Sequence, residues 1–206
     1  MNVRSRPPAL ARAQPQPDLF GAEDTVPAGF RHRAAIIDPA EEAALAERLA
    51  ALDFQPFDFH GYLANRRVVG FGLRYDYGRR AVIAAPPIPD WLAPLRDKVG
   101  DFAGRPAEAF VQVLINEYAP GAGIGWHRDK PQFDEVVGVS LLSPCAFRFR
   151  RKTGETWARR SLIAPPRSAY LLSGPARSEW EHSIPPVEAL RYSITFRTLA
   201  PERSGA

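Results

Sequence analysis

The second half of the chain is a series of short strand-like runs, and this feature most constrains the fold. The runs are rich in β-branched, aromatic and aliphatic residues, and turn residues separate them at short intervals. In order, they read FVQVLINEY, EVVGVSLL, AFRFRR, RRSLIAP, SAYLLSG and RYSITFR. Many short strands in succession are typical of a β-sandwich or jelly roll.

Two helices are expected before these strands. Asp38 can cap the first helix, because Pro39 suits the first helical position and Glu41 lies three residues after the cap. The stretch APPIPDWLAPLRDKVGDFA can become helical from about Pro89. RAAIID reads as a short strand, and the glycine-containing RRVVGFGLRYDY as a bent or bulged strand pair. The expected fold class is α+β, mainly β, with the helices packed on one face of the jelly roll.

Composition limits the domain organisation and the compartment. Residues 1–28, rich in Pro, Ala, Gln and Arg, are expected to form a flexible tail. Residues 29–200 then form one domain, and residues 201–206 a short C-terminal tail. The sole cysteine, Cys145, excludes an intrachain disulfide. Because the chain lacks a long apolar run and an apolar signal segment, we expect a cytoplasmic monomer without membrane association.

The stretch GIGWHRDKPQF raises the question of a metal site. His127 and Asp129 lie two positions apart, which alone also fits a solvated loop. His182 follows 53 positions after Asp129. Two histidines and one carboxylate can occupy one face of an Fe(II) ion and leave the other positions open. A structural zinc site would normally need four protein ligands.

Polar residues on one face of two strands indicate an anionic ligand. In RYSITFR, Arg191, Ser193, Thr195 and Arg197 share one face, and the apolar residues share the other. If the polar face lines a barrel interior, its two arginines are buried cations that require anions, and a dicarboxylate could supply both. Asn116 and Tyr118 share a face of VQVLINEY and could bind the same ligand, or could simply belong to a polar edge strand.

These stretches together resemble the AlkB family of iron(II)- and 2-oxoglutarate-dependent dioxygenases. The resemblance is carried by NEYAPGAGIGWHRDK, His182 and RYSITFR, and extends from about residue 30 to 200. It implies a double-stranded β-helix (jelly-roll) core with two N-terminal helices. It further implies that iron is held by His127, Asp129 and His182. The residues implied to hold 2-oxoglutarate are Asn116, Tyr118, Arg191 and Arg197.

The resemblance also implies an activity. Such an enzyme uses O₂ and converts 2-oxoglutarate to succinate and CO₂ while it hydroxylates a C–H bond; a hydroxylated N-methyl group then leaves as formaldehyde. Arg191 is expected to anchor the distal carboxylate, and Arg197 to lie nearer the metal-bound end. The expected substrates are modified bases in nucleic acid, in DNA or RNA repair or tRNA modification.

Two segments could contact a nucleic acid, although each has an ordinary structural explanation. AFRFRRKTGETWARRS is expected to form a hairpin that turns at Thr153-Gly154, and its arginines, including Arg148 and Arg150, could contact phosphates or be merely solvated. RRVVGFGLRYDYGRR contains Tyr75 and Tyr77. The resemblance places this segment in a lid over the base, where aromatic stacking suits an extruded base; both tyrosines could equally belong to the core.

One departure from the family leaves the substrate open between DNA and RNA. Repair members often carry an acidic residue two positions after the ligand aspartate, and Pro131 stands there in this chain. The net charge of +4 permits a nucleic-acid partner without requiring one. The alternatives are an AlkB-like oxygenase of protein side chains and a non-catalytic RNA-binding module.

Overall fold

The computed structural model describes residues 26–201, apart from residues 60, 61, 77 and 80 and the side chains of 57–59 and 62–64. Most of the proposed N-terminal tail, residues 1–25, and nearly all of the C-terminal tail therefore lie outside the described residues. No helix in the described part of the chain has the length and hydropathy needed to cross a lipid bilayer.

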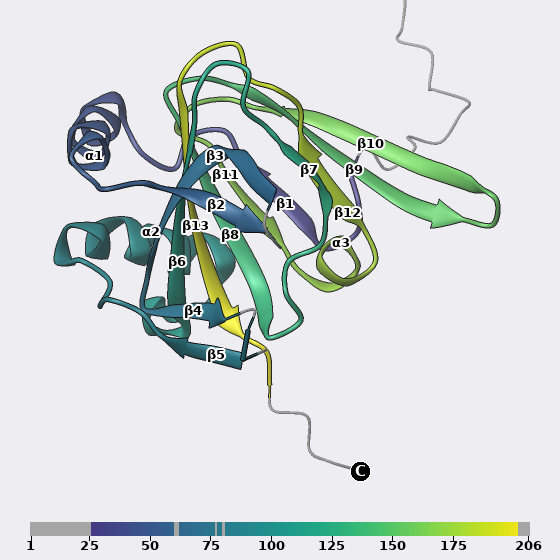
Figure 1. Ribbon diagram of the computed structural model, residues 1–206, viewed down its shortest axis with the longest axis horizontal. Helices are drawn as coiled ribbons and strands as arrows, with labels where there is room; N and C mark the ends of the chain where they lie inside the picture. The colour runs from purple at the N-terminus through teal and green to yellow at the C-terminus, as the bar shows by residue number, and fades with distance from the viewer. Residues whose placement is uncertain (1–25, 60–61, 77, 80, 202–206) are drawn as a thin grey trace, which may run out of the picture.

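Two antiparallel sheets form the centre of the fold (Figure 1). The large sheet contains, in spatial order, β1 (Phe30–Arg33), β11 (Ala169–Leu172), β8 (Phe133–Leu141), β13 (Arg191–Leu199), β6 (Phe110–Tyr118), β3 (Tyr62–Phe71) and β2 (Gln55–Phe59). The small sheet contains β10 (Thr156–Ala164), β9 (Cys145–Thr153), β12 (Glu181–Ile184) and β7 (Ile124–His127). The separate strands β4 (Leu73–Asp76) and β5 (Ala81–Ala84) pair with each other. The expected jelly-roll fold class is confirmed.

The helices cover the large sheet on the side away from the small sheet (Figure 1). They are α1 (Pro39–Ala50), the 3₁₀ turns η1 (Asp90–Leu92) and η2 (Ala107–Ala109) and α2 (Ala93–Ala103). The short α3 (Gly174–Ser178) lies instead beside β12, and its Ala176 belongs to the core toward the small sheet (Figure 1). Helix α1 begins where the capping box predicted it. The amide of Glu41 donates to Asp38 Oδ1 at 2.8 Å, and the amide of Asp38 donates to Glu41 Oε2 at 2.9 Å. The second expected helix is also present, as η1 followed by α2.

The central strands of the large sheet contribute to two cores because their side chains alternate. Ile115 and Ile194 pack with Leu49 of α1 and Val99 of α2 in the first core. The second core lies toward the small sheet, where Phe147 and its neighbours pack against residues such as Tyr118 and Val136. Every second residue of β6 and β13 therefore points away from the helices, toward the space between the two sheets.

The structure corrects two of the expected strands. RAAIID is not a strand: β1 ends at Arg33, and Ile36 and Ile37 are buried in a bend that leads into α1. The segment RRVVGFGLRYDY does bend, but its two halves do not pair with each other, because β3 joins β2 and β6 whereas β4 joins β5. The bend lies at Gly72, whose φ is +76° and where a Cβ would collide with the Val111 carbonyl oxygen.

The predicted hairpin is confirmed, whereas two short strands had no clear signal in the sequence. Strands β9 and β10 pair from Thr153↔Thr156 onward, and Gly154 in the turn has a φ of +60°. Neither β7 nor β12 was predicted, since each has only four residues and lies in a loop-like sequence. These two strands carry both histidines of the candidate site.

Candidate active site

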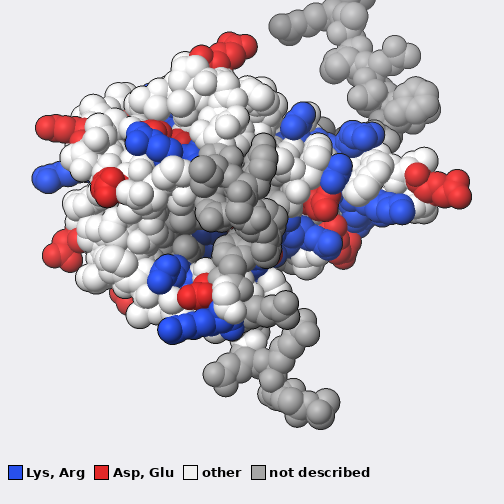
Figure 2. Space-filling model, viewed as in Figure 1, with Lys and Arg blue, Asp and Glu red and all other residues white. Residues whose placement is uncertain are grey.

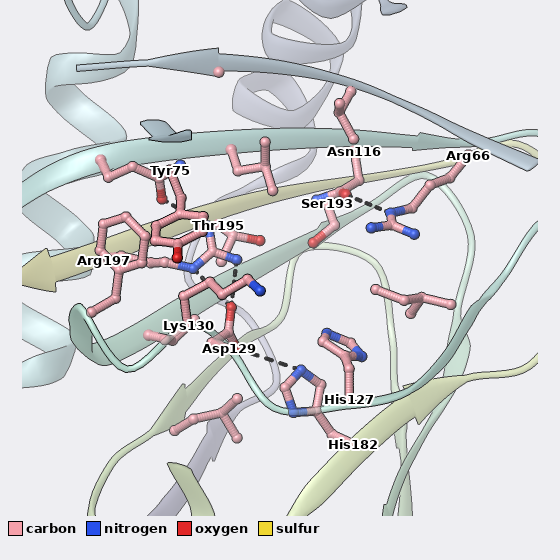
Figure 3. A pocket seen from close by; sticks show the side chains of 18 of the residues that line it. Arg66, Tyr75, Asn116, His127, Asp129, Lys130, His182, Ser193, Thr195 and Arg197 are labelled. Carbon is pink, nitrogen blue, oxygen red and sulfur yellow. Dashed lines mark hydrogen bonds and ion pairs between the residues drawn. The ribbon is translucent and has the colours of Figure 1, made fainter. Parts of the chain in front are cut away.

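The structure brings His127, Asp129 and His182 together between the two sheets (Figure 3). His127 ends β7, and His182 is its direct partner in the antiparallel neighbour β12. The centroids of the two imidazole rings are therefore only 4.2 Å apart. Asp129 lies two residues beyond β7, and one potential ligand atom from each of the three residues lies within 4.8 Å of the others. The three side chains thus form one compact set of donors.

The protonation of the two histidines suits a metal ligand. Nδ1 of His127 lies 2.9 Å from the carbonyl oxygen of Gly125. Because a carbonyl oxygen only accepts, Nδ1 carries the proton and the lone pair of Nε2 remains available. Burial lowers the pKa of His127, and it lowers the pKa of His182 to about 3, where the charge of His127 adds to the effect. Both rings are therefore neutral near pH 7, the form that binds metals.

Arg197 keeps Asp129 charged and fixes its orientation. Burial by itself would raise the pKa of Asp129, but Arg197 together with His182, His127 and Arg177 outweighs burial and holds that pKa well below its usual range. Nε and Nη2 of Arg197 lie 2.9 and 2.7 Å from Asp129 Oδ1. The other oxygen, Oδ2, lies 3.6 Å from Nε2 of His182. One carboxylate oxygen is thus held by the arginine, and the other is directed toward the histidines.

Arg191 is a buried cation whose hydrogen bonding is incomplete. Its side chain is fully buried, and Nη2 donates to Ser140 Oγ at 2.6 Å. Its Nε and Nη1 have no hydrogen-bond partner among the residues that the structure describes. A buried guanidinium in this state is costly unless an anion binds it. These unsatisfied donors fit a carboxylate ligand, which a guanidinium can bind through two parallel hydrogen bonds.

A cavity of about 1130 Å³ is bordered by His127, Asp129 and His182. Asn116 and Tyr118 of β6 line it with Arg197 of β13, as the alternation of the strands predicted. Asn116 Oδ1 accepts from Nε of Arg66 at 3.2 Å. Burial raises the pKa of Tyr118, so its hydroxyl stays protonated and can donate. Arg191 does not itself line the cavity, but it lies beside Tyr118, with its guanidinium carbon 5.1 Å from the ring centroid.

Several cavity residues were missed in the sequence. Gln112 accepts from Arg197 Nη1 at 2.7 Å, and its period-2 spacing from Asn116 on the same strand could have revealed it. Arg66 and Lys130 also line the cavity. Neither residue was singled out: Arg66 begins the stretch RRVVGFGLRYDYGRR, in which only the tyrosines were named, and Lys130 directly precedes Pro131 in a segment that resembles a solvated loop.

The expected substrate residues fall into three groups. Tyr75 lines the cavity, with Nζ of Lys130 lying 5.1 Å from its ring centroid. Tyr77 lies outside the described residues. Arg148 and Arg150 are on the outer face of the small sheet, where their guanidinium carbons lie 5.1 and 4.7 Å from the ring centroid of Trp126. Trp126 borders the cavity, but neither arginine is among the residues that line it.

Known proteins resemble this chain in sequence. The model of the 2OG-Fe(II) oxygenase superfamily matches residues 34–197. The Arabidopsis thaliana protein named alkylated DNA repair protein ALKBH8 homolog is 32% identical over 147 residues, which cover 60% of this chain and 42% of that protein. The Mus musculus protein named tRNA (carboxymethyluridine(34)-5-O)-methyltransferase ALKBH8 is 29% identical over 171 residues, covering 79% of this chain and 25% of that protein. This chain thus spans less than half the length of either relative.

The fold is also shared with a solved structure. The structure of OsALKBH1 superposes with a TM-score of 0.60 at 15% sequence identity, covering 82% of this chain and 98% of that one. At this level of identity the similarity shows a common fold. The candidate site lies in the space between the two sheets of that fold.

Proposed function

This chain belongs to the 2OG-Fe(II) oxygenase superfamily, and we propose that it is a dioxygenase that dealkylates or hydroxylates modified bases in nucleic acid. Membership implies Fe(II), 2-oxoglutarate and O₂ as cofactors and co-substrates. The observation that carries the proposal is the unsatisfied guanidinium of Arg191 in the same interior as a neutral, preassembled His–Asp–His set. One feature fits a dicarboxylate and the other fits a divalent metal ion.

The donor set assigns a role to each residue. His127, Asp129 and His182 would hold Fe(II), and Arg191 would bind the distal carboxylate of 2-oxoglutarate. Arg197, already bonded to Asp129, lies where it can approach the metal-bound end of the cofactor. Asn116 and Tyr118 would hydrogen-bond the same ligand from β6. When bound, iron and 2-oxoglutarate supply the oxidation of a C–H bond by O₂, with succinate and CO₂ as co-products.

The surrounding residues keep this site ordered and dry. The ring of Phe147 stacks on His182, with 5.4 Å between the centroids and 12° between the planes. Val136, Leu172 and Ile184 border the same cavity and are buried. These apolar side chains restrict the movement of the imidazoles and exclude water from the metal side of the cavity. A fixed, water-poor site strengthens the electrostatic interactions within it.

Nucleic acid is the substrate class that the relatives support, since one is named for alkylated DNA repair and another for tRNA. The outer face of the β9–β10 hairpin offers cations that suit phosphates of a bound strand, and Figure 2 shows basic side chains along this projecting arm. Arg148 and Arg150 lie on β9 of this hairpin, and the ring of Tyr75 lines the cavity, where a base could stack on it. We further propose that residues 29–200 constitute the oxygenase domain.

The direct test measures the conversion of 2-oxoglutarate to succinate in the presence of Fe(II) and ascorbate. A panel of modified nucleosides in DNA and tRNA, with methylated peptides in parallel, is analysed by mass spectrometry for lost or hydroxylated groups. We expect nucleic-acid-dependent succinate release that His127→Ala abolishes. If His127→Ala released succinate at the wild-type rate, the metal assignment would be refuted. If only the peptides stimulated succinate release, the proposed substrate class would be refuted.

A further inference from the structure

The outer face of the small sheet carries an exposed indole ring that neither hydrophobic core uses. Trp157 of β10 is 38% exposed, whereas the other three tryptophans of the chain are buried or half-buried. It lies on the β9–β10 hairpin, which projects from the rest of the molecule (Figure 1). Trp157 belongs to neither of the two cores, so its ring does not contribute to the packing of the interior.

A guanidinium group holds this ring in place. The guanidinium carbon of Arg150 lies 4.3 Å from the ring centroid of Trp157 and 4.7 Å from that of Trp126. Because β9 lies between β10 and β7 in the sheet order, Arg150 bridges the two indoles. Nε of Arg150 also donates to Glu181 Oε2 at 2.5 Å, which fixes the guanidinium. Cation–π contacts orient the indole ring, and its exposed part forms an ordered apolar platform.

The surroundings of Trp157 are basic. Lys152 is its direct partner in the register of the hairpin, and Arg159 is the partner of Arg150. Both Lys152 and Arg159 are exposed. The charged side chains on the outer face of β9, β10 and β12 are four cations and one carboxylate: Arg148, Arg150, Lys152, Arg159 and Glu181. Since Glu181 is bonded to Arg150, this face keeps a net positive charge that complements phosphates.

Trp126 connects this face to the cavity. It directly precedes the candidate ligand His127 and borders the cavity, while its ring contacts Arg150 on the outer face. The guanidinium carbon of Arg148 lies 5.1 Å from the centroid of the same ring, and Nε of Arg148 donates to Ser183 Oγ at 3.1 Å. A strand with one base in the cavity can therefore place an adjacent nucleotide over the outer face.

We propose that the outer face of the small sheet is a second nucleotide-binding site, in which an unpaired base beside the target nucleotide stacks on Trp157 while the surrounding cations contact the phosphates. This inference rests on the proposed nucleic-acid substrate. Every nucleobase has a π-face that can stack on an aromatic ring, and an arginine beside that ring adds a cation–π contribution. An acidic peptide would satisfy the cations but would offer the indole ring no planar partner.

Oligonucleotides with and without bases test this site. The full chain, with iron and 2-oxoglutarate omitted, is titrated against labelled single-stranded oligo(dT) and against an abasic oligomer with the same number of phosphates, and fluorescence anisotropy measures each Kd. We expect Trp157→Ala to weaken the binding of oligo(dT) at least about fivefold, the factor that stacking of one base contributes, and to leave the binding of the abasic oligomer unchanged. Trp157→Phe should retain most of the affinity, because a phenyl ring still stacks.

Two matched variants separate stacking from charge and from general surface effects. Arg159→Met should weaken the binding of both oligomers alike, because it removes a cation of this face and no aromatic ring. Ile163→Ala removes an apolar side chain that is 62% exposed on the same strand, at the end of the hairpin away from Trp157, and should change neither Kd.

Three results would overturn the proposal. If Trp157→Ala bound oligo(dT) as tightly as the wild type, the ring would serve only to stiffen the hairpin. If this variant lost affinity equally for oligo(dT) and the abasic oligomer, the ring would not stack on a base. If polyglutamate bound as tightly as oligo(dT) and with the same dependence on Trp157, the partner would be an acidic protein. Because none of these measurements requires turnover, a lack of succinate release would count against the proposed function alone.

Discussion

At the scale of single residues, Arg191 and Arg197 show how the same side chain on the same strand can have opposite effects on stability. Arg197 is bonded to the buried carboxylate of Asp129, whereas Arg191 is fully buried with two donors that no described residue satisfies. Removing a charge that pairs with a buried partner destabilises a protein, while replacing an unpaired buried charge by an apolar side chain need not. The two arginines can therefore be distinguished by one substitution.

We expect Arg197→Met to lower the free energy of unfolding by about 3–5 kcal/mol, because it leaves Asp129 buried without its partner. Arg191→Met should be neutral or stabilising, by up to about 4 kcal/mol, because it removes unsatisfied donors. Urea unfolding of the metal-free protein measures both values. The Arg191 variant should also lose the stabilisation that added 2-oxoglutarate and Mn(II) confer on the wild type. A strongly destabilised Arg191→Met protein would show that Arg191 is mainly structural.

The histidines give the metal-free protein a predictable response to acid. Burial lowers the pKa of His182 from 6.5 to about 3, so the unfolded chain binds a proton in this pH window that the folded chain does not. Stability should therefore be complete above about pH 6.5 and decrease as the pH falls toward the folded pKa. His127 contributes in the same direction.

Urea unfolding between about pH 7.5 and pH 5 measures this dependence. His182→Gln should flatten it, since the glutamine has no proton to gain. If the free energy of unfolding of this variant fell with pH as steeply as that of the wild type, His182 would not titrate as its burial requires.

At the scale of elements, the pairing of β7 with β12 assembles the candidate metal site. His127 and His182 are far apart in the chain, and their direct pairing in the register places both rings on the inner face of the small sheet. Gly123, just before β7, allows the two strands to approach closely. A Cβ at this position would lie 2.7 Å from the Ile184 carbonyl oxygen and 2.9 Å from the Pro185 carbonyl carbon.

Gly123→Ala should therefore displace β7 from β12 and separate the two imidazoles. We expect at least about a tenfold loss of Mn(II) affinity, in the range seen when the groups that orient metal ligands are removed, measured by isothermal titration calorimetry. Gly125→Ala is the matched control, because an added Cβ there has no heavy atom within 4 Å. Equal affinities in the two variants would contradict the role of this close approach.

At the scale of the whole molecule, the proposed cofactors would join the two sheets. The small sheet and the loop after β7 supply the metal ligands, whereas β13 of the large sheet supplies both arginines. A ligand that contacts both sheets stabilises the folded state by mass action, because the unfolded chain has no such site. The two cofactors should also depend on each other, since Arg197 contacts Asp129 and would face 2-oxoglutarate.

Mn(II) alone, at roughly a hundred times its dissociation constant, should raise the free energy of unfolding by about 2.7 kcal/mol, 2-oxoglutarate added with it should raise that free energy further, and EDTA should reverse the effect. Each ligand alone should give less than the pair. Thermal shift and urea unfolding measure the difference, and His127→Ala should show no response to the metal. If the stabilisation by the pair equalled the sum of the stabilisations by the separate ligands, the two ligands would not depend on each other, which would argue against a shared site.

The sequence by itself determined the properties that depend on local backbone geometry. The cap of α1, the turn of the β9–β10 hairpin and the alternating faces of β6 and β13 could all be predicted, because they follow from residues within a few positions of one another. The order of His127, Asp129 and His182 also identified the candidate ligands, although only through their combination with the arginines and the resemblance to a known family.

Only the tertiary structure decided how these parts meet. It set the register that pairs His127 with His182, the bonding of Arg197 to Asp129, and the placement of Arg66 and Lys130 in the cavity while Arg148 and Arg150 remain outside it. These features depend on hydrogen bonds between strands that are distant in the chain, and short strands such as β7 and β12 have no periodicity long enough to reveal their partners. The sequence determined which chemical groups were available, and long-range pairing determined which of them share a cavity.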